Sequence, residues 1–278
     1  RAGEVIGALV AVTLDNPLAY SLLGTGSHRY NALAVHPGSN KMYAISNGSG
    51  SSTDNDTGKL VRVDCLNGST TLSAARIAEL PLVNTVSGAI NAAGDYYIGL
   101  RGGVRRLYRV VDLEGQIAAG GVVTAQDSDI IETIPYGGTI AQATPLKSGE
   151  SIDISDFAFH QNGNLYAVLR YAADAKGNIP RYRMIYFDVS AWPKVYRYLV
   201  GPDEILIKGS SQFGAVFSTV NAVFGADNGG KGVYRFDIGD GTAARLGAAN
   251  PTSVNDGASS INADPPLQAD IQVTKTNT

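Results

Sequence analysis

Histidine is the side chain in this 278-residue chain best suited to proton transfer near neutral pH, and the chain has three of them. His36 and His160 stand at equivalent points of two similar segments, AVHPGS and AFHQNG, each directly after an apolar run. A catalytic histidine is placed once by function, whereas these two follow a repeat. We therefore expect both to satisfy backbone groups at a turn. His28, in GTGSHRYN, breaks the pattern and is the better functional candidate, and no histidine pair has zinc-site spacing.

Aspartates also recur, each at the end of a similar apolar segment. The segments KLVRVD, RLYRVVD, RMIYFD and GVYRFD end at Asp64, Asp112, Asp188 and Asp237. Such a set resembles carboxylates arranged for acid–base work. Residues that recur once per structural unit are, however, separated by the size of the molecule. We expect these carboxylates to cap turns by accepting hydrogen bonds from nearby backbone amides.

One loop has the composition of a calcium site. The stretch SSTDNDTGK brings oxygen ligands together at Asp54, Asn55 and Asp56, although it lacks the twelve-residue EF-hand pattern. Ca²⁺ at this loop is the single cofactor that the sequence suggests, and we otherwise expect none. Cys65 is the sole cysteine, so no internal disulfide is possible, and we expect a buried, inert thiol.

A repeat organises these residues. Counting from a fifth copy, LVAVTLD at Asp15, the aspartates are separated by 49, 48, 76 and 49 residues. Each later copy follows a predicted hairpin, and the four hairpins begin near Asn31, Ser87, Asp156 and Phe213. After the aspartate comes a turn and then a poorer fourth strand, as in AYSLLG, ARIAEL, KVYRYLV and ARLGA. Four strands per unit of about 40–50 residues indicate an all-β chain folded as a β-propeller, with five blades or alternatively six. The long interval predicts an insertion within Gly120–Gly149.

The two ends of the chain complete each other. LVAVTLD and AYSLLG supply the third and fourth strands of a unit that has no hairpin before them. Asn255–Asp264, NDGASSINAD, resembles an inner strand without partners. Joining them closes the ring with combined N- and C-terminal strands and removes exposed sheet edges. We predict a propeller over residues 1–264 and a proline-led extended strand or linker over 265–278.

The segment after Pro265 and Pro266 alternates polar and apolar residues as a strand does. It has no obvious partner in a closed ring. It can link to a further domain, dock on its own propeller, or add as a donor strand to another molecule. The residues of this candidate interaction strand are Ala269, Asp270, Ile271, Gln272, Val273, Thr274, Lys275 and Thr276.

The same tail, ADIQVTKT, resembles the opening strand of the Ig-like "conserved repeat" domains of large bacterial surface proteins. The motifs NALAVHP, LYAV and NDGAS resemble the uncharacterised propeller-like domain that often precedes such repeats. The resemblance covers most of the chain and implies an exported surface, adhesive or assembly protein. It implies other copies of the chain or neighbouring Ig-like domains as partners, and it supplies no catalytic residues.

Charge and hydropathy exclude several other classes. A net charge of −3 gives no electrostatic basis for nucleic-acid binding. The longest strongly apolar run, VIGALVAV, is too short to span a bilayer. Low Lys, Cys and Met contents suit an extracellular or cell-surface location. Three N-x-S/T triplets make Asn47, Asn55 and Asn67 candidate glycosylation sites.

Two functions follow from these observations. The first is a non-catalytic extracellular module: a surface scaffold, an adhesin domain or a self-assembling filament subunit whose C-terminal strand pairs between copies. The alternative is a propeller hydrolase or lyase with an acid–base or metal site in the central channel. That alternative requires charged residues from several blades, and near the inner strands the sequence offers Arg29, Asp153, Asp156 and Asp256.

Overall fold

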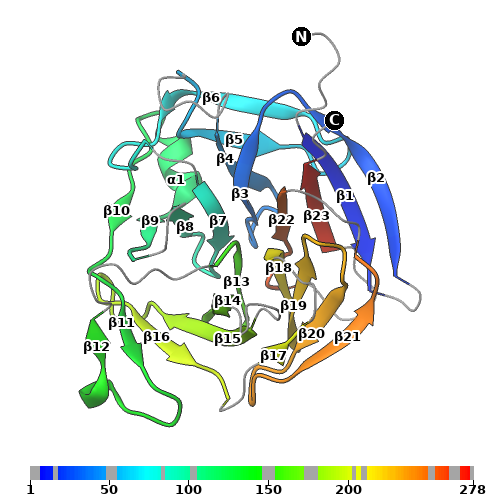
Figure 1. Ribbon diagram of the computed structural model, residues 1–278. Coiled ribbons are helices and arrows are strands. Elements are labelled where there is room, and N and C mark those ends of the chain that lie inside the picture. Colours follow the sequence, from blue (N-terminus) through cyan, green and yellow to red (C-terminus); the bar gives the residue numbers. More distant parts are fainter. Residues whose placement is uncertain are drawn as a thin grey trace.

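The computed structural model describes residues 7–14, 18–47, 55–82, 85–100, 105–145, 154–171, 181–201, 205–207, 212–249, 254–262 and 270–275. Within these ranges the chain forms five β-sheets, four of four strands and one of seven. The sheets stand around a common axis as in a β-propeller (Figure 1). The innermost strands contact one another in the closed order β3, β7, β13, β18, β22 and back to β3.

Three sheets follow the chain from the axis outward. The first has β3 (Tyr30–Val35), β4 (Met42–Ser46), β5 (Lys59–Val63) and β6 (Thr70–Arg76). The second has β7 (Thr85–Ile90), β8 (Tyr96–Leu100), β9 (Tyr108–Val110) and β10 (Gln126–Asp127). The third has β18 (Phe213–Thr219), β19 (Ala222–Asp227), β20 (Val233–Phe236) and β21 (Ala243–Gly247). The predicted hairpins β3–β4, β7–β8 and β18–β19 are confirmed.

The closing sheet joins the two ends of the chain. Its order is β2 (Ala19–Gly26), β1 (Gly7–Thr13), β23 (Asp270–Lys275) and β22 (Val254–Ala258). The predicted closure by N- and C-terminal strands is thus present, as the blue and brown-red strands of Figure 1 show. β23, however, is not among the strands predicted for the ring. It is the tail for which the sequence offers no obvious partner, and it lies inside this sheet.

The seven-stranded sheet departs from the regular pattern. It contains β13 (Phe157–Phe159), β14 (Leu165–Tyr171), β15 (Arg181–Asp188) and β16 (Tyr196–Leu199), followed by β11 (Glu132–Ile134) and β12 (Thr144–Pro145); β17 (Ile205–Leu206) pairs with β15. β11 and β12 come from the predicted insertion, and β11 joins β16 in parallel. The β-propeller prediction is therefore confirmed, but the predicted count of five or six blades is not: the described chain has four regular four-stranded blades, and the insertion enlarges the remaining sheet to seven strands.

A short helix lies between β9 and β10 in the second sheet. α1 (Leu113–Ala118) begins after Asp112, whose carboxylate accepts the Gly115 N–H at its first turn. The 3₁₀ helix η1 (Ile140–Gln142) lies between β11 and β12. Inner strands such as β3, β4, β18 and β19 are buried along their whole length. Both faces of these strands are covered by neighbouring sheets, which explains their nearly continuous apolar sequences.

Close packing near the axis gives a first testable prediction. A Cβ added at Gly88 of β7 would lie 2.2 Å from the Ala32 carbonyl oxygen, where β3 bulges. We expect Gly88→Ala to lower the free energy of unfolding by about 1–3 kcal/mol or more, because backbone must move to relieve the overlap. Urea unfolding measures this loss. Gly121→Ala is the matched control, since its Cβ would meet nothing within 4 Å; equal losses at the two sites would contradict the prediction.

Candidate functional site

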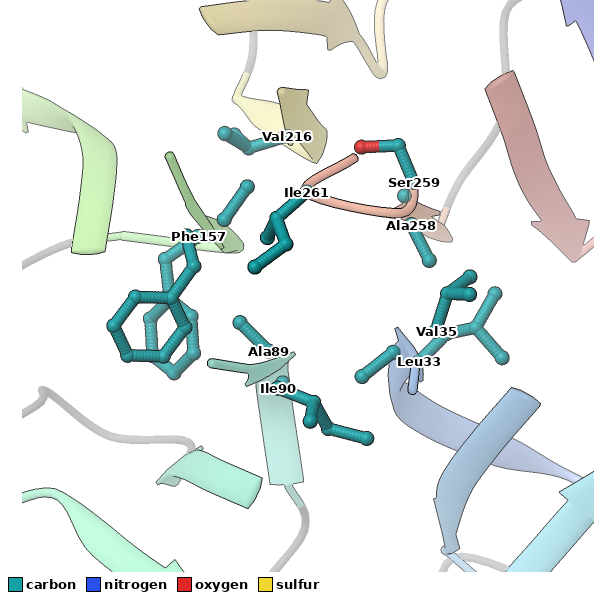
Figure 2. A pocket seen from close by; sticks show the side chains of 14 residues that line it. Leu33, Val35, Ala89, Ile90, Phe157, Val216, Ala258, Ser259 and Ile261 are labelled. Carbon is teal, nitrogen blue, oxygen red and sulfur yellow. The ribbon is translucent and has the colours of Figure 1, made fainter. Parts of the chain in front are cut away.

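The axis of the ring is lined by apolar side chains from several innermost strands. Figure 2 shows Leu33, Phe157, Val216, Ala258 and Ile261 around this space. The rest of the lining is apolar or glycine apart from Ser259, and the space holds about one water molecule. The arrangement therefore packs the axis as a core and leaves no room there for an organic substrate.

Asp156 lies beside this packed axis, fully buried. One carboxylate oxygen accepts the Phe157 N–H at 2.8 Å. The other accepts the Val216 N–H of β18 at 2.6 Å and the Gly257 N–H of β22 at 3.0 Å. A single side chain thus connects the innermost strands of three sheets. Such bonds to a charged acceptor are the stronger class of hydrogen bond.

Asp256 makes the corresponding connection on the other side of β22. It is 1% exposed, and its Oδ2 accepts the Leu33 N–H of β3 at 2.7 Å. The buried Tyr96 hydroxyl donates to the neighbouring Ala32 carbonyl. The residue after β22 is also bonded to β18, because the Ser218 N–H donates to the Ser259 hydroxyl at 2.9 Å. The sequence places Asp156 and Asp256 near the inner strands, and the structure brings their charges together.

The electrostatics of this pair follow from burial. Burial, and secondly the charge of Asp256, raise the pKa of Asp156 well above its usual value, against the lowering effect of its three N–H donors. Burial and the two carboxylates raise the pKa of Tyr96 as well, and burial and Asp256 raise that of Tyr30. The site thus disfavours further negative charge. Of the other two residues considered for channel chemistry, Asp153 lies outside the described ranges and Arg29 is half-buried.

Another buried carboxylate, that of Asp95, has the opposite electrostatic character. The Asp95 carboxylate forms an ion pair with the Arg109 guanidinium at 2.6 Å and accepts a hydrogen bond from the Asp112 N–H at 2.9 Å. Burial alone would raise the pKa of Asp95, but these hydrogen bonds outweigh it and lower the pKa. The Arg109 guanidinium carbon lies 5.7 Å from the ring centroids of both Tyr97 and Trp192, so the ion pair also joins two sheets.

Two of the three histidines have the predicted structural role. The His36 Nδ1 accepts the N–H groups of Gly38 and Ser39, and the His160 Nδ1 accepts the Asn162 N–H, each at 3.3 Å. Both rings therefore close the turn of an inner hairpin. His28, the functional candidate, is half-buried, and its Nδ1 lies 2.8 Å from the Thr70 hydroxyl oxygen and 3.0 Å from that of Ser27. These contacts are with hydroxyl groups and bring no carboxylate to orient the ring for proton transfer.

The recurrent aspartates cap turns as predicted. The carboxylates of Asp64, Asp188 and Asp237 each accept the N–H two residues later, at 2.8–2.9 Å. Asp112 caps α1 instead, and Asp15 lies outside the described ranges. The expectation of a buried thiol is wrong: Cys65 is exposed, because it stands in the turn that Asp64 opens between β5 and β6.

The predicted calcium loop is described only in part. Asp54 lies outside the described residues, Asn55 is exposed, and the Asp56 carboxylate pairs with the Lys59 ammonium at 2.9 Å. In the described part of the chain, no three His, Cys, Asp or Glu side chains are grouped as metal ligands. Of the candidate glycosylation sites, Asn55 and Asn67 are exposed. The Asn47 amide oxygen instead accepts the Thr85 N–H and hydroxyl, both at 3.2 Å.

The candidate interaction strand lies in the interior of the closing sheet. β23 pairs antiparallel with β1 from Ala8↔Thr274 to Val12↔Asp270. On its other edge it pairs antiparallel with β22 from Val254↔Lys275 to Ala258↔Ile271. The ends of the predicted strand, Ala269 and Thr276, fall outside the described residues. We call the position between β1 and β22 the strand slot. It holds an extended segment by backbone pairing along both edges.

Comparisons with known proteins support the fold. Residues 7–264 match a family described as a repeat of unknown function, DUF6923. Curated proteins give no match. A TolB candidate from Agrobacterium tumefaciens superposes with a TM-score of 0.52 at 12% identity, covering 99% of this chain and 100% of that one. The PQQ-bound aldose sugar dehydrogenase from Streptomyces coelicolor superposes with a TM-score of 0.42 at 11% identity, and the superposition covers 91% of this chain and 96% of that one. The TolB likeness shows a β-propeller fold and carries no activity to this chain.

Proposed function

Because the chain belongs to the DUF6923 family, a repeat of unknown function, we propose a function from its closing sheet: a non-catalytic structural module whose copies pair through the C-terminal strand. The observation that carries this proposal is the strand slot. β23 fills it by backbone pairing with β1 and β22, and the same backbone bonds form whether the strand comes from the same chain or from another copy.

Strand exchange suits this topology for a second reason. β23 follows β22 after a connection of eleven residues, 259–269, which includes Pro265 and Pro266. A strand on a long connection exchanges between identical copies without new contacts having to evolve. Reciprocal exchange gives a closed dimer, and exchange in one direction gives a chain of copies that can extend into a filament.

The proposed cellular location and neighbouring domains follow from the sequence. The resemblance to propeller-like domains before Ig-like repeats supports an exported protein at a bacterial cell surface, with scaffold or adhesive roles and Ig-like domains as neighbours. The described residues contain no helix that is long and apolar enough to span a membrane. The hydrolase or lyase alternative is not favoured, since Asp156 and Asp256 are buried and bonded to backbone amides beside a packed axis.

Single cysteines at paired positions test the exchange directly. Val10 and Gln272 face each other across β1 and β23. One preparation carries Val10→Cys and the other Gln272→Cys, both with Cys65→Ser because Cys65 is exposed. A disulfide between the two kinds of chain can form at this pair only when β23 of one copy occupies the slot of the other. We expect covalent dimers on a non-reducing gel after mixing.

The control pairs Gln272→Cys with Gly121→Cys, an exposed position outside the closing sheet. Dimer yields no higher for the slot pair than for this control pair would refute exchange of the strand. Electron microscopy of the unmodified chain then separates closed dimers from filaments.

A further inference from the structure

Every sheet of the ring ends in an outermost strand that has a strand neighbour on one side only. In the described chain these strands are β2, β6, β10, β12 and β21. The free side of such a strand presents backbone N–H and C=O groups with which another strand can pair. Natural sheets protect these edges by keeping them short or by placing a charge or a proline on them. An outermost strand without such protection is a candidate site for a further strand.

Four of the five outermost strands carry this protection. β10 and β12 have two residues each, and they contain Asp127 and Pro145. β6 contains Arg76, and β21 contains Arg245. β2 has eight residues, AYSLLGTG, and contains neither a charge nor a proline. Among the described outermost strands, β2 is therefore the longest and the one whose residue types do least to prevent pairing.

A bulge divides β2 into two parts. The pairing of β2 with β1 shifts by one residue between Leu9 and Val10, and Leu23 is the extra residue of β2. The bulge separates Ala19–Leu22 from Gly24–Gly26. In Ala19–Leu22 all residues except the second are exposed, and Figure 1 shows β2 as the outer border of the closing sheet. Because a bulge interrupts regular pairing, Ala19–Leu22 is the part of β2 that can accept a further strand.

Exposed leucines mark the same edge. Leu66 and Leu22 are the two most exposed large apolar side chains of the described residues, at 81% and 66%. Leu22 lies in the edge segment itself. Leu66 precedes Asn67, whose carbonyl oxygen is so close to β2 that a Cβ added at Gly24 would lie 1.7 Å from it. Single exposed apolar residues are common, but two of them beside one uncharged strand edge are typical of a contact surface.

We propose that Ala19–Leu22 pairs antiparallel with the same segment of a second copy, so that two closing sheets join edge to edge. A second copy fits this edge for two reasons. A twofold axis places a strand antiparallel to its own copy, so that one segment supplies both sides of the contact. In addition, β2 contains no charge that would repel the same strand of another copy. Backbone hydrogen bonds form across the edge, and the Leu22 side chain of each copy covers apolar surface of the other.

This contact goes beyond the strand exchange proposed above and does not depend on it. Edge pairing leaves β23 in the strand slot of its own chain, whereas exchange moves β23 to another copy. Edge pairing alone gives a closed dimer, because the single β2 of each copy is then paired. Copies that use both contacts have two different interfaces and can extend into a filament.

Sedimentation of the full chain under reducing conditions tests the edge contact. So short a pairing belongs to the weak class of interfaces, and we expect a dimer with a dissociation constant between about 1 µM and 1 mM. Leu22→Lys should raise that constant about tenfold or more, because it removes apolar contact and places two like charges near each other. Ile140→Lys is the matched control: Ile140 is 55% exposed, lies in η1 beside the seven-stranded sheet, and should leave the constant unchanged.

Hydrogen exchange separates backbone pairing from a contact made by side chains alone. The amides of Ala19–Leu22 should exchange more slowly above the dissociation constant than below it, whereas those of β21, another outermost strand, should not change. Three results would each overturn the proposal: a chain that stays single at every concentration, a dimer that Leu22→Lys and Ile140→Lys affect equally, and amides of β2 whose exchange does not depend on concentration.

The cysteine-labelled copies distinguish edge pairing from strand exchange. A dimer that Leu22→Lys weakens, with no cross-link between the Val10→Cys and Gln272→Cys chains, supports edge pairing and rejects the exchange. Cross-linked chains whose yield Leu22→Lys does not change, with no dimer that this substitution weakens, support the exchange and reject edge pairing. A chain that neither cross-links nor forms a dimer rejects both.

Discussion

Asp156→Ala is expected to lower the free energy of unfolding by about 3 kcal/mol or more, because a buried donor without an acceptor costs about 1–3 kcal/mol and this change leaves several such donors. The N–H groups of Phe157, Val216 and Gly257 all lose their acceptor, and they lie where water cannot replace it. The stability of a folded domain is about 5–15 kcal/mol, so this one change removes a large part of it. Urea unfolding monitored by circular dichroism measures the loss.

The matched control is Asp237→Ala. Asp237 also accepts a backbone N–H, that of Gly239 at 2.8 Å, but it is exposed in a surface turn. Water replaces its carboxylate, and we expect a loss of about 1 kcal/mol or less. Similar losses at Asp156 and Asp237 would show that the buried carboxylate does not hold the three sheets together.

The regular parts of the fold are predictable because their signals are local. Each inner hairpin has apolar strands around a short turn, and Asp64, Asp188 and Asp237 at the ends of third strands cap the turns that follow. The structural role of His36 and His160 is predictable for the same reason: the repeat puts them at equivalent turns. Residues that recur with the repeat are explained by the repeat, and their recurrence in the sequence is enough to separate them from candidate catalytic groups.

The seven-stranded sheet is not predictable in the same way. β11 pairs in parallel with β16, about 64 residues later in the chain, and no local pattern encodes such a contact. The roles of Asp156 and Asp256 also depend on distant contacts, since their acceptor oxygens meet backbone amides 60 to 223 residues away. The sequence shows carboxylates near inner strands; the closed ring shows that they meet.

The strand slot is absent from the predicted ring, although the sequence contains the evidence for it. The predicted closing unit has a third and a fourth strand at the N-terminus and an inner strand at Asn255–Asp264. Each other unit has four strands, so this one lacks its second. The tail after Pro266 is the remaining strand-like segment. It pairs with β22 as β4 pairs with β3, but the connection between β22 and β23 is too long to be recognised in the sequence as a hairpin turn. A count of strands per unit is sufficient to place it.

Deleting every residue after Pro266 therefore tests the tail as a part of the ring. The truncated chain loses β23 and with it five paired positions on β1 and five on β22. Backbone hydrogen bonds contribute about 0.5–1.5 kcal/mol each, so we expect the free energy of unfolding to fall by about 3 kcal/mol or more. The edges of β1 and β22 also become unpaired, which favours aggregation. Thermal and urea unfolding measure the loss, and unchanged stability would show that the ring closes without this strand.

A synthetic peptide of residues 267–278 turns the same deletion into a test of the slot. Because a ligand that binds only the folded state raises its stability in proportion to the logarithm of its concentration, the melting temperature of the truncated chain should rise steadily with added peptide. A peptide of the same composition in scrambled order is the control. Rescue by the native order alone would mean that the slot accepts its strand from a separate molecule. Exchange between copies differs from folding of a single chain only in this step, the acceptance of β23 from another molecule. If no peptide stabilised the truncated chain, β23 would be a strand of its own ring only, and the proposed exchange would be rejected.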